Sequence, residues 1–321
     1  MVDFRYHIVS IVAVFLALAI GIVLGTYTIN GQVLSNIRHQ VRSLRHDNDG
    51  LHNRIRTLER EQGQDKAFVA AVDPLIVEQK LAKQRVVVVL APGASGGLAK
   101  DVSNMLASAG AKVTATVKVS KGWTDPQQLP LLDDLASRLA EPGITLPSGS
   151  PYERVGLVLA AALLRHPPER PANTVGTLTS ADSTALAGFK TANLLSLSPD
   201  HPEPATLAVL VTPGAPDRPT KTDRDSANAL GMLARELDFA GGGTVVAGPP
   251  TAAASAGVIA AVRSDRTARK AVSTVDDADT ETGRIRLVLA LAAELRDTSG
   301  QYGVGPGADA PVPSPAPLPS P

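Results

Sequence analysis

Residues 34–62 read LSNIRHQVRSLRHDNDGLHNRIRTLEREQ, and the rest of the chain is organised around them. Apolar residues recur along this segment at alternating intervals of three and four. With the first leucine at heptad position a, positions a and d hold Leu34, Ile37, Val41, Leu44, Asn48, Leu51, Ile55 and Leu58. A repeat kept over four heptads predicts a coiled coil.

The residues beside this seam favour a parallel homodimer. In a parallel pair, position g faces position e of the partner's next heptad, so Asp47 meets His52 and Arg54 meets Glu59. Asn48, a single polar residue at position a, favours two strands in register. The alternative is an amphipathic helix lying on its own domain, which usually has a broader apolar stripe. We therefore predict a parallel coiled coil over residues 31–65.

An uncharged segment precedes the coiled coil. Ile8 to Ile29 contains no charged residue, and about 22 residues at about 1.5 Å each are long enough to cross a bilayer core. A cleaved signal peptide is the alternative. An uncleaved anchor over residues 1–30 is favoured, because the apolar run is longer than a signal core and no small-x-small cleavage site comes after it.

Small residues recur every four positions on one side of this segment, at Ala13, Ala17, Gly21 and Gly25. Such a face lets two membrane helices approach closely, so Gly21 and Gly25 are predicted to belong to the same dimer interface. The helix is expected to loosen after this face, at Asn30-Gly31.

The orientation of the anchor rests on two opposing signals. Arg38, Arg42 and Arg45 come after the anchor, and by the positive-inside rule they place the C-terminal domain in the cytoplasm. A short tail before the anchor and a large domain after it are instead typical of a signal anchor that exports its C-terminal domain. We predict a single-pass protein of the cell membrane with its C-terminal domain outside the cytoplasm.

Residues 66–303 are predicted to form a mainly parallel α/β domain. The helix of the coiled coil is expected to falter at Gly63, and a further helix to be interrupted at Pro74. Two β-α-β units come next, each with Pro-Gly after its first strand, which suggests two related halves. The expected strands are 85–90, 112–119, 205–212 and 243–247; the expected helices are 98–109, 129–139, 152–165 and 224–239; 284–296 is expected to begin as a strand. Residues 304–321 are predicted to be a disordered Pro-rich tail.

Composition excludes several classes of protein. The chain has 321 residues, with 31 Lys and Arg against 31 Asp and Glu, so a general nucleic-acid binder is not expected. It has no cysteine, which excludes disulfides, zinc fingers and thiolate catalysis.

The loop after the first expected strand has the spacing of a nucleophile elbow, with Gly93, Ser95 and Gly97. A catalytic triad would also need a later acid and a histidine, and the downstream histidines, His166 and His201, both lie beside prolines. The loop also lacks the spacing of a phosphate-binding motif. A tight β-α turn is favoured, and no enzymatic activity is predicted.

Carboxylates gather before Gly283, at Asp276, Asp277, Asp279 and Glu281. Alternating carboxylates can bind calcium, but the glycine of an EF-hand is replaced by Thr282. A solvated turn is therefore the favoured interpretation.

Copper ligands cannot be assigned from the residues alone. His39 and His46 both fall at heptad position f, about 10 Å apart on a helix, which is too far to share an ion. Beyond the initiator, Met105 and Met232 are the only methionines, and they form no soft-ligand cluster. No cofactor is therefore predicted.

Three segments carry a family resemblance. The first is YHIVSIVAVFLALAIGIVLG at 6–25, the second is STVDD at 273–277 followed by GRI at 283–285 and LVLAL at 287–291, and the third is GQYGVG at 300–305. Together and in this order they resemble the actinobacterial MctB family, whose members are copper transport proteins of the cell envelope. The resemblance implies a role in copper homeostasis or efflux, with copper as the transported ion. The residues themselves also fit a non-enzymatic dimeric scaffold that binds a partner protein of the envelope.

Overall fold

The computed structural model describes residues 4–141, 144–165 and 183–314. Within the first helix, the description covers the backbone but not the side chains of residues 4, 5, 26–38, 65, 66, 70 and 74. The chain divides into two compact units, Met1–Ala67 and Phe68–Pro321.

Helix α1 (Phe4–Val77) runs without a break through the predicted anchor and the predicted coiled coil. The expected breaks at Asn30-Gly31, Gly63 and Pro74 are therefore wrong. One glycine costs a helix only about 1 kcal/mol relative to alanine, and the helix-forming residues on either side outweigh this. The helix ends where Gln79 takes a left-handed backbone conformation, with φ 58°.

Among the described residues of the second unit, seven strands form one sheet, in the order β3-β2-β1-β4-β5-β6-β7. The strands are β1 (Arg85–Leu90), β2 (Lys112–Val119), β3 (Leu195–Ser198), β4 (Leu207–Val211), β5 (Thr244–Ala247), β6 (Ser273–Val275) and β7 (Gln301–Tyr302). Neighbouring strands are parallel, except that β3 is antiparallel to β2. The prediction of a mainly parallel α/β domain is confirmed.

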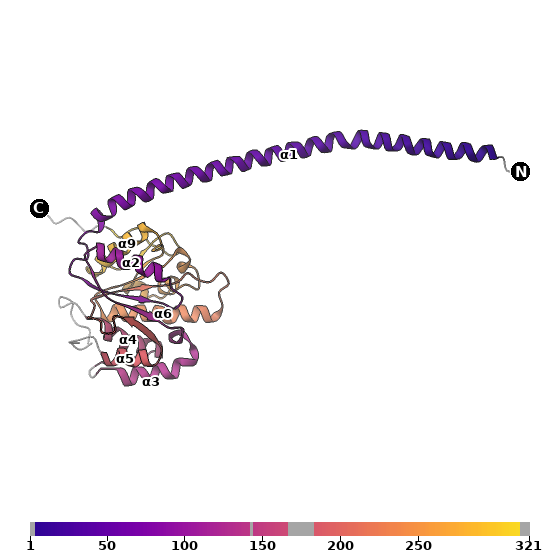
Figure 1. Ribbon diagram of the computed structural model, residues 1–321. Helices are drawn as coiled ribbons and strands as arrows, with labels where there is room; N and C mark the ends of the chain where they lie inside the picture. The colour runs from indigo at the N-terminus through magenta and orange to yellow at the C-terminus, as the bar shows by residue number, and fades with distance from the viewer. Residues whose placement is uncertain (1–3, 142–143, 166–182, 315–321) are drawn as a thin grey trace. The chain divides into compact units, whose positions relative to one another are not determined.

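Helices cover both faces of this sheet. They are α2 (Gly96–Ser108), α3 (Leu129–Leu139), α4 (Pro151–Leu163), α5 (Ser183–Thr191), α6 (Lys221–Ala240), α7 (Val258–Ser264), α8 (Ala268–Ala271) and α9 (Glu281–Glu294); the short 3-10 helices are η1 (Lys121–Thr124), η2 (Pro126–Gln128) and η3 (Pro250–Ala253). Helices α2 and α9 lie on one face, and α4 and α6 lie on the other (Figure 1).

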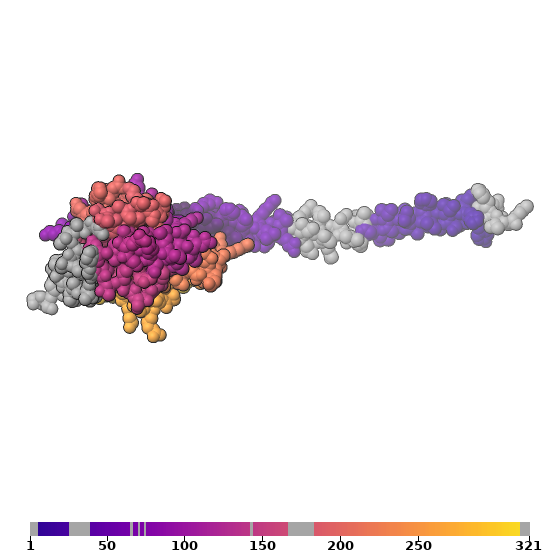
Figure 2. Space-filling view, turned by 90° about the horizontal axis from the view of Figure 1, so that it is seen from below, coloured from indigo at the N-terminus to yellow at the C-terminus, as the bar shows by residue number. Residues whose placement is uncertain are grey.

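The central strands supply both layers of the core. In β1, Val87 and Val89 join the core under α4 and α6, whereas Val86 and Val88 join the core under α2 and α9. This division results from the alternation of side chains along a strand. It is the reason that β1 reads as an unbroken apolar run. On the face of the unit drawn in Figure 2, segments that are far apart in the sequence adjoin one another, as the magenta, salmon and orange surfaces show.

Expected and observed elements differ mainly at the short strands. The bounds of β1, β2 and α3 equal the expected ones. Strands β3, β6 and β7 and helices α5, α7 and α8 were not expected, because segments this short carry too little periodicity to detect. The expectation of a strand at the start of 284–296 is wrong, since α9 is helical from Glu281. That the two β-α-β units are related halves stays a prediction.

The beginning of the predicted tail contacts the domain. The amide of Asp309 donates to the carbonyl of Gln301 in β7 at 2.7 Å, and Tyr302 forms an isolated β-bridge with Ala310. Residues 315–321 lie outside the described part of the chain.

Replacing Leu210 of β4 with Ala should lower the free energy of unfolding by about 2–5 kcal/mol, because the side chain is fully buried and its loss leaves a cavity. Urea unfolding of the full chain in lipid nanodiscs, followed by tryptophan fluorescence, measures this effect. Trp123 is the only tryptophan and is fully buried in the second unit. Leu131→Ala, at a position 37% exposed in α3, is the control and should cost less than about 1 kcal/mol. Equal losses would contradict the central position of β4.

Candidate functional site

The predicted dimer seam lies along α1 in the first unit. The side chains of Val41, Leu44, Leu51, Ile55 and Leu58 are between 39% and 67% exposed in the single chain. Asn48 is also exposed. Its backbone carbonyl oxygen lies 2.8 Å from Nδ1 of His52, one turn later in the helix. The side chains of Leu34 and Ile37 lie outside the described residues. The seam is therefore an apolar stripe that this chain does not cover with its own described residues, and its role as a dimer interface stays a prediction.

The unbroken helix separates the two predicted contact faces. Successive residues of an α-helix are turned by about 100°, so Gly25 and Leu34, nine residues apart, lie on nearly opposite sides. Gly21 lies on the same side as Gly25. One straight parallel pair therefore cannot bury both the glycine face and the seam, and the two faces do not support a single interface.

One segment among the described residues is long and apolar enough to cross a membrane, Tyr6–Gly25 at the start of α1. None of its side chains is buried within the chain. A helix that is apolar all round and uncovered suits a lipid environment better than water.

The loop after β1 is a helix start. The hydroxyl of Ser95 accepts a hydrogen bond from the amide of Leu98 at 3.3 Å and so caps α2. Gly93 has φ +81°, a conformation that glycine adopts without strain. His201 is exposed, and His166 lies outside the described residues. This loop therefore forms the tight β-α turn that the sequence favours over a nucleophile elbow.

Within the described residues, no group of three or more His, Cys, Asp or Glu side chains could hold a metal ion. Met105, a residue of α2, is buried in the core. The sulfur of Met232 lies 3.4 Å from the hydroxyl of Ser150. The positions of Met105 and Met232 therefore do not identify a copper ligand.

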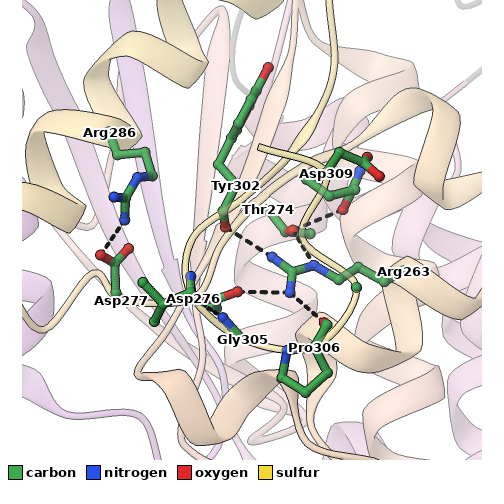
Figure 3. A network of polar contacts seen from close by, with 12 residues as sticks. Arg263, Thr274, Asp276, Asp277, Arg286, Tyr302, Gly305, Pro306 and Asp309 are labelled. Carbon is green, nitrogen blue, oxygen red and sulfur yellow. Dashed lines mark hydrogen bonds and ion pairs between the residues drawn. The ribbon is translucent and has the colours of Figure 1, made fainter. Parts of the chain in front are cut away.

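Two of the three segments that carry the family resemblance meet at one edge of the sheet. Strand β6 leads into Asp276 and Asp277, α9 comes after them, and β7 lies beside β6. Figure 3 shows the resulting network, in which the guanidinium of Arg263 in α7 lies among groups from all of these segments except α9. No pattern in the sequence pointed to Arg263, because it lies outside the resembling segments.

Arg263 and Asp276 form a buried ion pair. Nη1 of Arg263 lies 2.7 Å from Oδ2 of Asp276, and the two side chains are 4% and 0% exposed. The guanidinium also donates to the hydroxyl of Thr274 and to the carbonyls of Tyr302 and Pro306, at 2.8–2.9 Å. Burial lowers the pKa of Arg263 from its ordinary value, and the carboxylate of Asp276 opposes this shift.

The other oxygen of Asp276 holds the segment after β7. Its Oδ1 accepts from the amides of Val304 and Gly305 at 2.7 and 2.9 Å. Gly303, with φ +132°, passes so close that a Cβ there would overlap the carboxylate. Both oxygens of Asp276 are thus engaged within the protein, so the residue serves as a structural tie.

Asp277 makes the neighbouring pair, with Arg286 of α9, and both side chains are buried. The favoured interpretation of Asp276 and Asp277 as part of a solvated turn is therefore wrong. Their charges are balanced by arginines of α7 and α9, and local spacing does not reveal these pairings. The glycine in the first turn of α9, Gly283, is required because a Cβ would overlap the carbonyl of Asp277.

The similarity to known proteins extends over nearly the whole chain. The family model described as "Copper transport outer membrane protein, MctB" matches residues 1–313. The proteins named copper transporter MctB of Mycobacterium tuberculosis and Mycobacterium bovis are each 31% identical over 316 residues, covering 95% of this chain and 97% of the relative. That of Mycobacterium leprae is 30% identical over 323 residues, with the same coverage.

Replacing Arg263 with Met should lower the free energy of unfolding by about 3–5 kcal/mol, because it leaves the charge of Asp276 buried without its partner. The measurement is urea unfolding of the full chain followed by Trp123 fluorescence. Arg138→Met is the matched control, since Arg138 pairs with Asp134 on the exposed face of α3 and should contribute less than about 1 kcal/mol. A similar cost for both variants would show that the buried tie is not important for stability.

Proposed function

The chain belongs to the MctB family, and from this membership we propose that it acts in copper transport as a membrane-anchored dimer that lowers the copper content of the cell. The observation that carries the proposal is the family match over residues 1–313. Relatives of nearly equal length are named as copper transporters and not as enzymes. These names do not favour the alternative of a scaffold for a partner protein.

Membrane anchoring is assigned to Tyr6–Gly25. About 20 residues at about 1.5 Å each span about 30 Å, the thickness of the hydrocarbon core. The second unit then lies on one side of the membrane, and we place it outside the cytoplasm. The family description names an outer membrane, which agrees with a position in the cell envelope.

The dimer is assigned to the seam of α1. Burial of five apolar side chains that are exposed in the single chain would stabilise a pair of helices, at about 25 cal/mol for each Å² removed from water. Asn48 would pair across the seam and select a parallel pair in register. The unbroken helix favours continuing the same heptads into the membrane, at Ile20 and Val23, which leaves Gly21 and Gly25 on the outer side of this pair.

Cysteine crosslinking tests the seam, because the chain has no cysteine of its own. Leu44→Cys places a thiol at position d, where the two helices of a parallel pair come within disulfide range, so mild oxidation of membranes should link most of the protein as a dimer. Asn53→Cys, at the outer position f, is the control and should remain unlinked. Non-reducing gel electrophoresis measures both. Equal linking of the two variants, or linking of neither, would contradict the seam.

The copper role is tested in a host strain that lacks the gene. We expect this strain to be more sensitive to copper and to hold more copper, and the full chain to restore both properties. A chain with Leu16→Arg and Ile20→Arg should not restore them, since a charge at the centre of a span disfavours insertion by about 2.5–3.5 kcal/mol per residue. The readouts are the growth-limiting copper concentration and the cell-associated copper measured by mass spectrometry.

A double control adds the same two charges outside the span, as Ser43→Arg and Asn53→Arg on the outer face of α1, and should restore tolerance. Deletion without any change in tolerance or copper content would refute the copper role. Full rescue by the Leu16 and Ile20 variant would refute the need for the anchor.

A further inference from the structure

A pocket opens at the carboxyl ends of the central strands. The strand order reverses between β1 and β4, because the chain builds from β1 toward β3 and then from β4 toward β7. At such a reversal the loops after the two strands diverge to opposite faces of the sheet and leave a crevice, which is where open α/β sheets bind their ligands. Here the crevice has a volume of about 490 Å³, within the range of small-molecule sites.

Loops from both sides of the reversal line this pocket. Pro92 comes after β1 and Pro213-Gly214 after β4, so the two Pro-Gly turns seen in the sequence come together here. The Cβ of Pro213 lies 3.8 Å from where a Cβ on Gly93 would be. Leu230 of α6 and Val258 of α7 add buried apolar surface. The walls are therefore short, rigid and partly apolar.

Carboxylates outnumber the cationic side chain among the charged groups of the pocket. Asp125 and Asp223 contribute carboxylates, and Lys121 contributes the single cationic side chain of the lining. Hydroxyls come from Thr124, Thr222 and Ser226. The formal charge of the lining is thus −1, which suits a ligand that donates several hydrogen bonds and carries no net negative charge.

Two helix starts near the pocket are capped by side chains, whereas α7, whose first residue Val258 lines the pocket, has no side-chain cap. Ser95 caps α2, and Thr220 and Asp223 form a capping box at the start of α6. Hydrogen bonds from Thr220 lower the pKa of Asp223, so its carboxylate is charged at neutral pH and offsets the positive end of the helix. Phosphate groups bind where helix amides are free and the field is positive. Here the two carboxylates outnumber the single lysine of the lining, so the field is not positive, and α7 is a short helix of seven residues.

We propose that this pocket binds an uncharged, hydroxyl-rich small molecule of the saccharide class. Its hydroxyls would donate to the carboxylates of Asp125 and Asp223, and its C–H faces would lie against the prolines and Leu230. Each carboxylate uses one oxygen at a helix start, Asp125 Oδ1 for the amide of Gln127 at 2.9 Å and Asp223 Oδ2 for the amide of Thr220 at 2.8 Å. The proposal does not depend on the copper role.

The test titrates the full chain in lipid nanodiscs with maltose, cellobiose, diacetylchitobiose and inorganic pyrophosphate. Trp123, which lies between the lining residues Gly122 and Thr124, reports binding by fluorescence, and saturation-transfer NMR confirms it. At least one disaccharide should bind saturably. Ser226→Phe, which fills the pocket from α6, should weaken that binding at least about tenfold. Ser137→Phe on the exposed face of α3 is the matched control and should bind as the wild type does.

A second variant keeps the test decisive if Ser226→Phe does not fold. Asp125→Asn preserves the cap of η2, because asparagine caps as well as aspartate, but removes a charged acceptor. It should weaken disaccharide binding, whereas Asp134→Asn, on the exposed face of α3, should not. Saturable binding of pyrophosphate alone, no saturable binding of any disaccharide, or unchanged binding by the folded pocket variants would overturn the proposal.

Discussion

The burial of β1 and β4 on both faces is the constraint on which the second unit depends. Each strand sends alternate side chains into two separate cores, so neither layer of helices can be removed without exposing one face of the sheet. Parallel strands also require crossovers, which bring every loop after a strand to one edge of the sheet. The adjacency of Pro92 and Pro213, and the pocket between the loops that carry them, results from this arrangement.

The far edge of the sheet is fixed by charge. Strands β6 and β7 are too short to contribute much apolar burial, and they are held by the pairs Arg263–Asp276 and Arg286–Asp277. A buried ion pair is stabilising only when its remaining hydrogen-bonding groups are satisfied. Arg263 meets this condition, and Oδ1 of Asp276 accepts from two amides after β7, so these contacts also fix the C-terminal segment. Within the described residues, Oδ2 of Asp276, Oδ1 of Asp277 and Nε of Arg286 have no hydrogen-bond partner.

Helix α1 passes through different surroundings along one continuous backbone. Its first part is apolar all round, and its middle part carries only a narrow apolar stripe that is exposed in the single chain. In the second unit the end of the helix meets the domain's own core, where Val69, at heptad position a, is half-buried and Val77, at the neighbouring position b, is fully buried. The stripe therefore needs a partner only where the chain itself provides no cover. Continuity also places Gly25 opposite Leu34, so the path of the backbone decides which faces can work together.

The long apolar segment, the heptad stripe and the β-α-β units at β1–β2 and β4–β5 could be predicted from the residues alone, because each is a local pattern repeated over many positions. The family could be recognised in the same way, through three segments. The antiparallel edge strand β3, the short strands β6 and β7, and the pairing of Asp276 with Arg263 became visible only in the folded chain. Such features depend on contacts between separate elements, and a local pattern carries no information about them. The pocket belongs to the same class, since its walls become neighbours only when the strand order reverses between β1 and β4.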